Sequence, residues 1–521
     1  MSRVATAPNE LHDAPSRVLG IPRWFLEIAA IFALFAIQGA WPVPDVNEPC
    51  YLGKAIHYWN PEYGAGDFFF ESDDTHWVFY VTFGWLSLLL PPLAFAWVGR
   101  LLTWWLLAWS WRRFSVAVLP RAGWSIASAA LLGMLTEHCH LAGEWIIGGV
   151  EAKGFAFVFL FLGLEAVVRS RWNRGLVFLG AASLFHVLVG GWAAVALGIV
   201  WLLSAKDRPR LSTLWPGLLG GFLLAFPSLY SALWLTWGVD PEIVKRANMI
   251  YVFERLPHHL CYFPSWYVFR FTSVALLWGI LVAVTPSDPG RRLVARLVFA
   301  SLLLAGIGLG LCLLIPHDPA LAAGLLRYYW FRLSDIAVPI GLALEIPAMI
   351  LWMRTWRPLL ARACFWIVFG LCLLHFGYFA GLRAIPQYPR AVRVPRYGSW
   401  RKACEWIVES GEIPPDACFL TPRLSQTFKW YTGRAEVVSW KDLPQDAHSI
   451  VAWRERLDDI YGTGLDDPWY AWHPGLMDLG SERLKELGEK YGADYVITRR
   501  WETLDLERLY VNQYYAIYRL K

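Results

Sequence analysis

Long apolar runs occupy roughly the first 382 residues of this chain, and the segments that join them alternate in character. A run of about 20 apolar residues is long enough to cross the hydrocarbon core of a bilayer as a helix. One set of connections is short and basic, and the other is longer and holds nearly all the Asp, Glu and His. The basic connections are Arg112 with Arg113, residues 169–174, residues 206–210, Arg291 with Arg292, and residues 354–362. Because short basic loops mark the cytoplasmic side, the acidic loops are predicted to face outward.

The composition supports a membrane protein and argues against other classes. The 521 residues are 56% hydrophobic and only 17% charged, which is unusual for a soluble protein of this size. Many of the 32 Trp side chains fit the two membrane interfaces. The net charge of +5 comes mostly from dispersed cytoplasmic loops, so no nucleic-acid partner is predicted. The eight Cys show no CxxC spacing, which gives no support to a zinc ribbon or a redox motif.

The apolar runs predict a polytopic α-helical membrane protein of about eleven transmembrane helices. Residues 1–22 are a polar tail without a cleavage site, which we expect to be cytoplasmic. Residues 23–382 form the transmembrane domain, and its first outer loop covers residues 44–76. Residues 77–90 are too short to span a membrane and are predicted to lie at its outer surface. Residues 175–204 begin and end in basic loops, which predicts two short helices hinged at Gly190 and Gly191, with His186 near the tip.

The composition changes after this body of apolar runs. Residues 383–399 form a basic, Pro-containing linker, and residues 400–521 have the pattern of a soluble α/β domain outside the membrane. Segments 417–421, 435–440, 495–498 and 514–519 are predicted to be strands. Segments 400–409 and 481–491 are predicted to be helices, the second with Ser481 as its N-cap and Gly492 as its stop.

The first outer loop carries the residues most suited to chemistry. It contains Asp45, Glu48 and Asp67, followed by Asp73 and Asp74. A carboxylate just beyond the first transmembrane helix can act as general base toward an acceptor hydroxyl. Glu48 is predicted to be functional because it follows the helix end and precedes aromatic residues. The Asp73–Asp74 pair is better explained as part of a solvated loop.

The chain resembles the GT-C membrane glycosyltransferases, which include protein O-mannosyltransferases, aminoarabinose transferases and the oligosaccharyltransferase catalytic subunit. The resemblance rests on first-loop carboxylates, a multi-helix body and an outer α/β domain. In that family the catalytic base belongs to an acidic pair shortly before a Tyr. Asn47 and Glu48 stand in that place before Tyr51. Because Asn replaces the first acid, Glu48 or Asp45 is the candidate base.

The resemblance implies transfer of a sugar from a polyprenyl-phosphate-linked donor to a glycan, lipid or protein acceptor. It implies a bacterial inner-membrane location, with the reaction on the extracytoplasmic face. The leaving phosphate needs cations, and the donor's tail needs the lipid bilayer. The candidate substrate-binding residues are Asp67, Lys153, His186, Arg246, Arg255, His258, His259, Arg327 and Arg332. Structural roles compete for three of these: an ion pair of Arg332 with Asp335, solvation of a loop by His258 and His259, and helix packing by His186.

The sequence leaves the cofactor open. Some members of this family use a divalent cation held by carboxylates, and Asp45, Glu48 and Asp67 are the candidates here. A zinc site pooling the segments 137–140 and 258–261 is a weaker alternative, because adjacent helical residues point in different directions.

Two other functions compete with the transferase. A transporter or lipid flippase should show internal repeats and ionisable groups near the midplane, and neither is evident. A non-catalytic protein could instead bind glycans through exposed aromatics such as Trp469, Tyr470 and Trp472.

Overall fold

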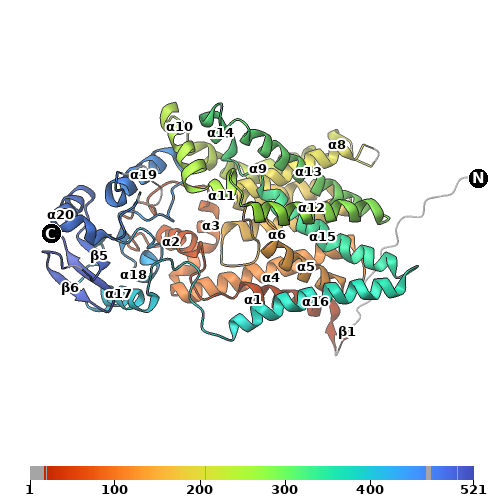
Figure 1. Ribbon diagram of the computed structural model, residues 1–521. Coiled ribbons are helices and arrows are strands. Elements are labelled where there is room, and N and C mark those ends of the chain that lie inside the picture. Colours follow the sequence, from red (N-terminus) through yellow and green to blue (C-terminus); the bar gives the residue numbers. More distant parts are fainter. Residues whose placement is uncertain (1–16, 19, 206, 465–470, 502) are drawn as a thin grey trace, which may run out of the picture.

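The computed structural model describes residues 17, 18, 20–205, 207–464, 471–501 and 503–521. Figure 1 shows a long body of helices with a small unit containing a β-sheet at one end. Most of the predicted N-terminal tail lies outside the described residues. The part that is described pairs two short strands, β1 (Arg17–Val18) and β2 (Ile21–Pro22), directly before the first helix.

The helical body contains eleven long helices in the described part of the chain and several short ones between them. The long helices are α1 (Arg23–Gly39), α4 (Pro92–Val118), α5 (Trp124–His138), α6 (Ala152–Val168), α7 (Trp172–Phe185), α8 (Val187–Leu203), α9 (Trp215–Trp234), α12 (Ser265–Val284), α13 (Pro289–Cys312), α15 (Arg332–Met353) and α16 (Pro358–Arg383). The shorter helices are α2 (Glu48–Trp59), α3 (Trp77–Phe83), α10 (Pro241–Met249), the π-helix η3 (Ile250–Arg255), α11 (Pro257–Leu260) and α14 (Pro319–Leu326).

Five helices in the described residues are long and apolar enough to cross a membrane. They are α9, α13, α15, α16 and the stretch Pro257–Val284, which comprises α11 and α12. The other long helices do not meet both criteria, so the eleven crossings stay a prediction. The predicted surface segment is a short apolar helix, α3, continued by a 3-10 turn (Gly84–Leu88) that ends before Pro91 and Pro92.

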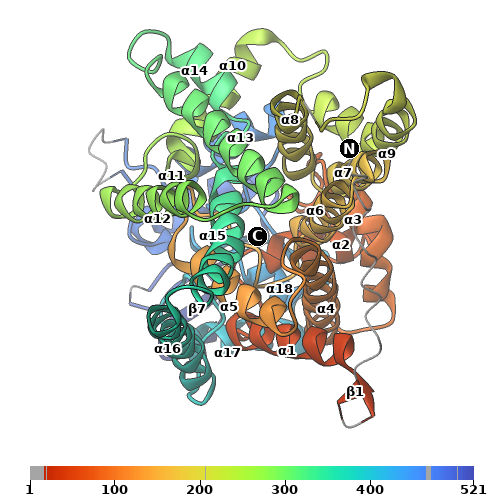
Figure 2. The same cartoon turned by 90° about the vertical axis from the view of Figure 1, so that its right-hand side faces the viewer.

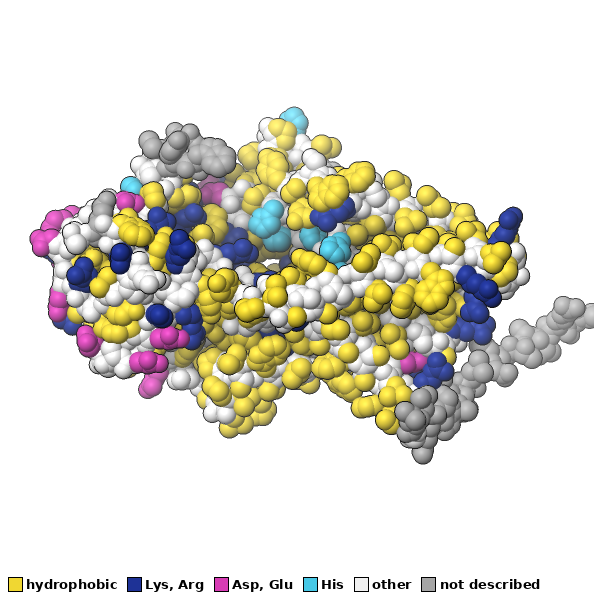
Figure 3. Space-filling model, turned by 60° about the horizontal axis from the view of Figure 1, so that its bottom comes forward, with side chains coloured by type: hydrophobic (Ala, Val, Ile, Leu, Met, Phe, Trp, Pro, Cys, Tyr) yellow, Lys and Arg dark blue, Asp and Glu magenta, His cyan; other side chains and the backbone are white. Residues whose placement is uncertain are grey.

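The helices surround α15, which lies near the centre of the view along the body in Figure 2. Most residues of α15 are buried, and Pro339 and Pro347 lie inside the helix. In contrast, α9 and α16 bury few residues and expose large apolar side chains along their length. Figure 3 shows this apolar surface along the body, with Lys and Arg gathered at the end farthest from the C-terminal unit. That distribution fits a helical body whose basic loops share one end.

The predicted glycine hinge between α7 and α8 is wrong in its position. The helices separate at His186, whose extended backbone ends α7 and begins α8. The His186 side chain accepts a hydrogen bond of 3.4 Å from the Val189 N–H and so caps α8. Gly190 lies inside α8, where a Cβ would come within 2.1 Å of the Ser183 backbone nitrogen. The glycine therefore permits close packing of the two helices, and the histidine marks the break.

The C-terminal unit contains a five-stranded sheet in the order β4-β3-β5-β7-β6. Strands β4, β3 and β5 are parallel, whereas β5, β7 and β6 are antiparallel. The elements of this unit are α17 (Tyr397–Glu409), β3 (Cys418–Leu420), α18 (Phe428–Thr432), β4 (Ala435–Glu436), α19 (Ala447–Tyr461), α20 (Gly480–Tyr491), β5 (Tyr495–Arg499), β6 (Arg508–Val511) and β7 (Tyr515–Arg519). Alternate side chains of β5 enter two cores: Val496 packs with α19 and α20, and Ile497 packs with α17.

The predicted strands and helices of this unit are present with shifts of one to three residues at their ends, except that the strand predicted over residues 435–440 covers only Ala435–Glu436. Gly492 ends α20 in the left-handed conformation, as predicted. The predicted Ser481 N-cap is wrong, because α20 begins at Gly480 and no side chain caps it. The Ser481 hydroxyl instead accepts a hydrogen bond of 2.7 Å from the Asp505 N–H. It therefore ties α20 to the segment that leads into β6.

Candidate functional site

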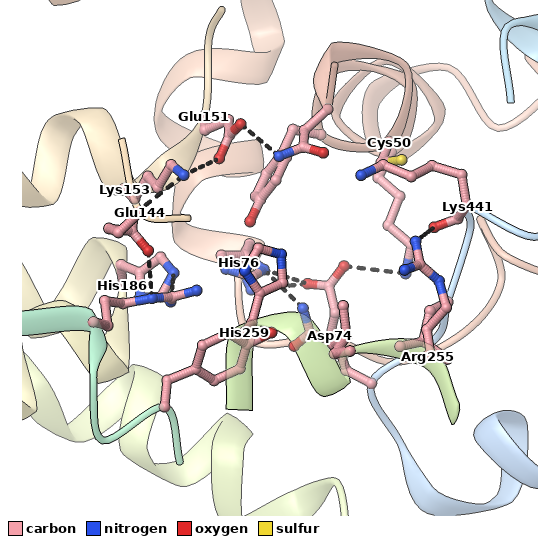
Figure 4. Close-up of a pocket in the computed structure, with 18 of the residues that line it drawn as sticks. Cys50, Asp74, His76, Glu144, Glu151, Lys153, His186, Arg255, His259 and Lys441 are labelled. Carbon is pink, nitrogen blue, oxygen red and sulfur yellow. Dashed lines mark hydrogen bonds and ion pairs between the residues drawn. The ribbon is translucent and has the colours of Figure 1, made fainter. Parts of the chain in front are cut away.

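A cavity of about 210 Å³ lies where the helical body meets the C-terminal unit. Most of its walls come from the helical body: α2, the segments before α3 and α6, the break at His186, η3, α11 and the start of α15. The segment after β4 supplies the wall that belongs to the C-terminal unit. Figure 4 shows the labelled side chains converging on it, with Glu144, Glu151 and Lys153 on one side and Arg255 and Lys441 on the other. Residues far apart in the sequence therefore build one polar site.

One face of α2, together with the residue just before the helix, supplies part of the first loop's contribution to this cavity. Asn47, Cys50, Tyr51 and Lys54 all line it. Their spacing of three, four and seven residues places them on the same side of a helix. Glu48 lies on another face of α2 and does not line the cavity.

Glu48 is a fully buried carboxylate with a complete set of hydrogen-bond donors. Arg100 donates hydrogen bonds of 2.7 Å to each of its two oxygens. The backbone N–H groups of Val150 and Asp45 donate to the same oxygens at 3.0 and 2.6 Å. A Cβ on Gly149 would lie 2.9 Å from the Glu48 carboxyl carbon, so the chain packs directly against it. No part of Glu48 is exposed to solvent.

Asp45 and Asp67 are also buried and paired. Arg390 donates to both oxygens of Asp45 at 2.6 and 2.7 Å, which anchors the linker after α16 to the first loop. Asp67 lies 3.1 Å from the Lys429 ammonium and accepts backbone hydrogen bonds from Phe70 and Glu436. Neither carboxylate lines the cavity. Both join the first loop to the C-terminal part of the chain.

Lys429 lies among three buried carboxylates. Its ammonium is 2.7 Å from Asp442, 3.1 Å from Asp67 and 3.5 Å from Glu436. The Cys50 thiol donates to the other oxygen of Asp442 at 3.1 Å and so links this cluster to the cavity. Burial raises the pKa of Glu436 to about 7, against the opposing effect of Lys429. One cation cannot balance three carboxylates at low dielectric, so the cluster favours retention of a proton.

Glu151 is the cavity carboxylate whose environment best suits a base. It directly precedes α6, and its two oxygens have different partners. Asn47 donates a hydrogen bond of 2.8 Å to one, and the Lys153 ammonium lies 3.3 Å from the other. Burial raises the pKa of Glu151, although Lys153 and Asn47 partly oppose this effect. A raised pKa makes a carboxylate a stronger proton acceptor near neutral pH.

The other two cavity carboxylates are more strongly held. Arg332 lies 2.6 Å from one oxygen of Glu144, and Lys153 lies 3.1 Å from the other. Asp74 pairs with Lys54 at 3.0 Å and accepts a hydrogen bond of 2.7 Å from the Tyr80 hydroxyl.

Asp74 is also firmly ionised. Burial raises its pKa, but Lys54, His76 and the Tyr80 hydroxyl together bring it below the usual range. The expectation that Asp74 lies in a solvated loop is wrong, because its side chain is only 8% exposed.

Three histidines complete the cavity wall. His186 lies 3.1 Å from the Arg332 guanidinium, and its ring centre is 5.4 Å from that of His76. His259 contacts the Ala142 carbonyl. Burial lowers the pKa of His76, which keeps its ring neutral at pH 7. His186 thus has a polar role beside Arg332 as well as its role at the helix break.

The cavity contains more cations than carboxylates. Its basic side chains are Lys54, Lys153, Arg255, Arg332 and Lys441, and its acidic side chains are Asp74, Glu144 and Glu151. Of these five basic side chains, Arg255 and Lys441 form no ion pair with a carboxylate in the described part of the chain. Arg255 donates to the Trp440 carbonyl at 3.0 Å, and desolvation lowers the pKa of Lys441. Two cations without an ion-pair partner among the described residues, both on one wall, favour an anionic ligand.

The substrate-binding residues predicted from sequence fall into two groups. Lys153, His186, Arg255, His259 and Arg332 line the cavity. The other four, Asp67, Arg246, His258 and Arg327, do not.

Asp67 pairs with Lys429, as described above, and each of the other three residues also has a local partner. Arg246 is exposed and pairs with Glu455 at 2.8 Å, and Arg327 donates to Asn248. The His258 ring lies beside that of His259, with ring centres 4.1 Å apart and the planes tilted by 43°. The predicted Arg332–Asp335 pair does not form, because Arg332 binds Glu144, and Asp335 accepts hydrogen bonds from the backbone of residues 141–144.

Sequence reasoning missed several cavity residues, among them Lys54, Glu144, Glu151 and Lys441. The spacing from Asn47 to Lys54 on an expected helix was an available signal. The positions of Glu144 and Lys441 depend on loops whose paths the sequence does not reveal.

In the described part of the chain, no group of three or more His, Cys, Asp or Glu side chains is arranged to hold a metal ion. The His138 ring contacts His375 at 3.0 Å, in a different place from His258 and His259. Of the predicted aromatic cluster, Trp469 and Tyr470 lie outside the described residues. Trp472 packs beside Trp440 with ring centres 5.8 Å apart.

Residues 398–460 match a domain family of unknown function, DUF6798. The matched segment runs from α17 to α19 and includes both Lys429 and Lys441. No curated protein matches the chain. The match therefore concerns the C-terminal wall of the cavity.

Proposed function

We propose that the chain is an integral membrane glycosyltransferase of the bacterial inner membrane. It moves a sugar from a polyprenyl-phosphate-linked donor to a glycan, lipid or protein acceptor on the extracytoplasmic face. The cation surplus of the cavity is the observation that carries the proposal. The five apolar helices that could span a membrane support a lipid-linked donor.

Arg255 and Lys441 are proposed to bind the donor phosphate. They are the cavity cations without a carboxylate partner among the described residues. As the acceptor hydroxyl attacks the sugar's anomeric carbon, the bond from that carbon to the phosphate oxygen breaks. Negative charge then grows on the departing phosphate, and preorganised cations stabilise it.

Glu151 is proposed to accept the proton of the attacking hydroxyl. It lines the cavity, burial raises its pKa, and Asn47 and Lys153 fix its orientation. The base role expected of Glu48 or Asp45 stays a prediction from sequence. The geometry favours Glu151 because four donors occupy the Glu48 oxygens and Arg390 covers Asp45.

The test is donor consumption by the full-length protein in nanodiscs, with a panel of polyprenyl-phosphate-linked sugars and a membrane extract as acceptor source. Glu151→Gln should lower consumption by about 10²- to 10⁴-fold, the usual contribution of a general base. Glu455→Gln, which changes an exposed carboxylate, is the matched control and should retain activity. Full activity in Glu151→Gln contradicts its role, and no consumption of any donor by the wild type contradicts the transferase itself.

A further inference from the structure

A second polar pocket, of about 230 Å³, lies at the opposite end of α6 from the cavity, and we call it the basic pocket. Its walls come from the region near the end of α4, the last turn of α6 and the turn that leads into α7. Figure 3 shows the Lys and Arg side chains that gather at this end of the body. The charged residues that line the pocket are Arg112, Arg113, Glu165, Arg169 and Arg171.

Glu165 orients two of these arginines. It lies in the last turn of α6 and is only 3% exposed. Its Oε1 accepts hydrogen bonds from both Arg113 at 3.1 Å and the Arg169 Nε at 2.7 Å. One carboxylate thus fixes two guanidinium groups and balances only one of their charges. The two arginine side chains are 35% and 46% exposed, so their remaining N–H groups are open to a ligand.

Arg171 adds a further positive charge. It is exposed, and its side chain forms no hydrogen bond or ion pair within the ranges that the structure describes. The turn that carries it is well defined: Ser170 has a φ of 61°, and the Arg171 N–H donates to the Ala166 carbonyl at 2.7 Å. Arg112 differs, because its Nε donates to Glu27 at 2.7 Å. The pocket therefore holds an excess of positive charge on ordered backbone.

An apolar stripe of α4 leads away from the basic pocket. Leu102, Trp105, Trp109, Arg113 and Val116 follow one another at spacings of three and four residues, so they lie on one side of the helix. Leu102 is 40% exposed, and the two Trp side chains are half-buried. The Arg113 guanidinium lies 5.5 Å from the centre of the Trp109 ring. An apolar stripe that ends in cations suits a molecule with an apolar tail and an anionic head.

We propose that the basic pocket binds the phosphate headgroup of an anionic phospholipid of the cytoplasmic leaflet. Arg113, Arg169 and Arg171 contact the headgroup, and an acyl chain lies along the α4 stripe. Basic pockets between helices on the cytoplasmic side of a membrane recognise such headgroups. A lipid fits better than a free phosphate, because a free phosphate has no use for the stripe. The inference requires the membrane location proposed above and does not depend on the transfer reaction.

The bound lipid stabilises the pair of helices that meets at this turn. Both helices also reach the cavity at their other ends: α6 has Lys153 in its first turn, and α7 ends at His186. A ligand that binds only the folded state stabilises that state by mass action. The anionic lipid should therefore raise the melting temperature of the protein.

Thermal unfolding of the full-length protein in neutral detergent tests the inference. Phosphatidylglycerol is added to the micelles in increasing proportion, and phosphatidylcholine keeps the total lipid constant. The melting temperature of wild type should rise and saturate. Arg171→Gln should need about ten times more phosphatidylglycerol for half the effect, as expected for loss of one hydrogen bond to a charged group. Arg354→Gln, which changes an exposed arginine of another basic loop outside the pocket, is the matched control and should respond like wild type.

Equal responses of wild type and Arg171→Gln overturn the proposal. Equal weakening by Arg171→Gln and Arg354→Gln also overturns it, because the lipid then responds to diffuse surface charge. Glycerol 3-phosphate that stabilises as well as phosphatidylglycerol overturns the lipid assignment in favour of a soluble phosphate. Phosphatidylcholine alone with the same effect overturns the requirement for an anionic lipid. The measurement needs no turnover, so its failure is separate from failure of the transferase, which donor consumption reports.

Discussion

Arg100 and Glu48 form a buried pair in which two guanidinium nitrogens each lie 2.7 Å from a different carboxylate oxygen. Neither side chain is exposed to solvent. Arg100 also donates to the Trp41 carbonyl at the end of the first helix. The pair therefore connects α4 with the start of α2, and through α2 it holds the cavity face in place.

Glu48→Gln should destabilise the protein, because the change leaves the Arg100 charge buried and uncompensated. Breaking a buried ion pair typically costs about 3–5 kcal/mol. Thermal unfolding of the purified protein in detergent measures the effect, with the exposed Glu482→Gln as control. The double variant Glu48→Met, Arg100→Met should recover part of the loss. A Glu48→Gln protein of normal stability without activity would return the base role to Glu48.

The contact between Lys153 and Glu151 leads to a prediction of how donor turnover depends on pH. A base works when deprotonated, so donor turnover should rise with pH through the raised pKa of Glu151. Lys153 lowers that pKa, and removing its charge should move the acidic limb of the kcat/KM profile to higher pH. Lys153→Met should therefore shift the midpoint upward and leave the plateau less affected. A midpoint at the same pH in both proteins would exclude Glu151 as the titrating group.

Variants of Arg255 and Arg246 compare the effect of a cation in the cavity with that of a cation on the surface. Arg255 lies at the cavity wall without a carboxylate partner in the described part of the chain, whereas Arg246 is exposed and pairs with Glu455. Arg255→Gln should raise the donor KM about 10- to 100-fold, as expected for lost hydrogen bonds to a charged group. Arg246→Gln should leave it unchanged. Steady-state kinetics with the preferred donor decide, and equal effects of both changes would mean that charge acts only at long range.

The sequence predicted those parts of the fold that depend on local pattern. Apolar runs gave the long helices, and Gly492 ended α20 as expected. Helix α19 was missed although its signals are local: Asp446 caps it through the Ser449 N–H, and Ile450, Trp453 and Leu457 form its buried face. The short edge strand β6 gave no comparable signal, because none of its side chains is buried.

The candidate site was harder to predict because its parts are distant in sequence. The first loop was correctly singled out as polar, but the direction of each side chain depends on where α2 begins. Glu48 is the first residue of that helix, so Asn47 faces the cavity and Glu48 faces Arg100. Lys441 reaches the site through a segment after β4, and no periodicity in the sequence predicts that path.

The raised pKa of Glu436 predicts how the stability of the junction between the first loop and the C-terminal unit changes with pH. Burial raises its pKa to about 7, from an ordinary value of 4.5, beside Lys429, Asp67 and Asp442. A carboxyl whose pKa is higher in the folded state binds its proton more tightly there. Its contribution to stability is therefore complete below pH 4.5 and is lost as pH rises through about 7.

Glu436→Gln should flatten this dependence, because an uncharged amide replaces the protonated acid. The hydroxyls of Thr421 and Ser425 both donate to the same Glu436 oxygen, Oε2, at 2.6 Å, and the amide oxygen of Gln can accept both hydrogen bonds. The melting temperature of wild type should fall between pH 5 and 8 more steeply than that of the variant. Glu412→Gln, an exposed carboxylate of the same unit, should keep the wild-type slope. Parallel curves for wild type and Glu436→Gln would mean that the three carboxylates around Lys429 are all ionised, with the buried negative charge compensated elsewhere.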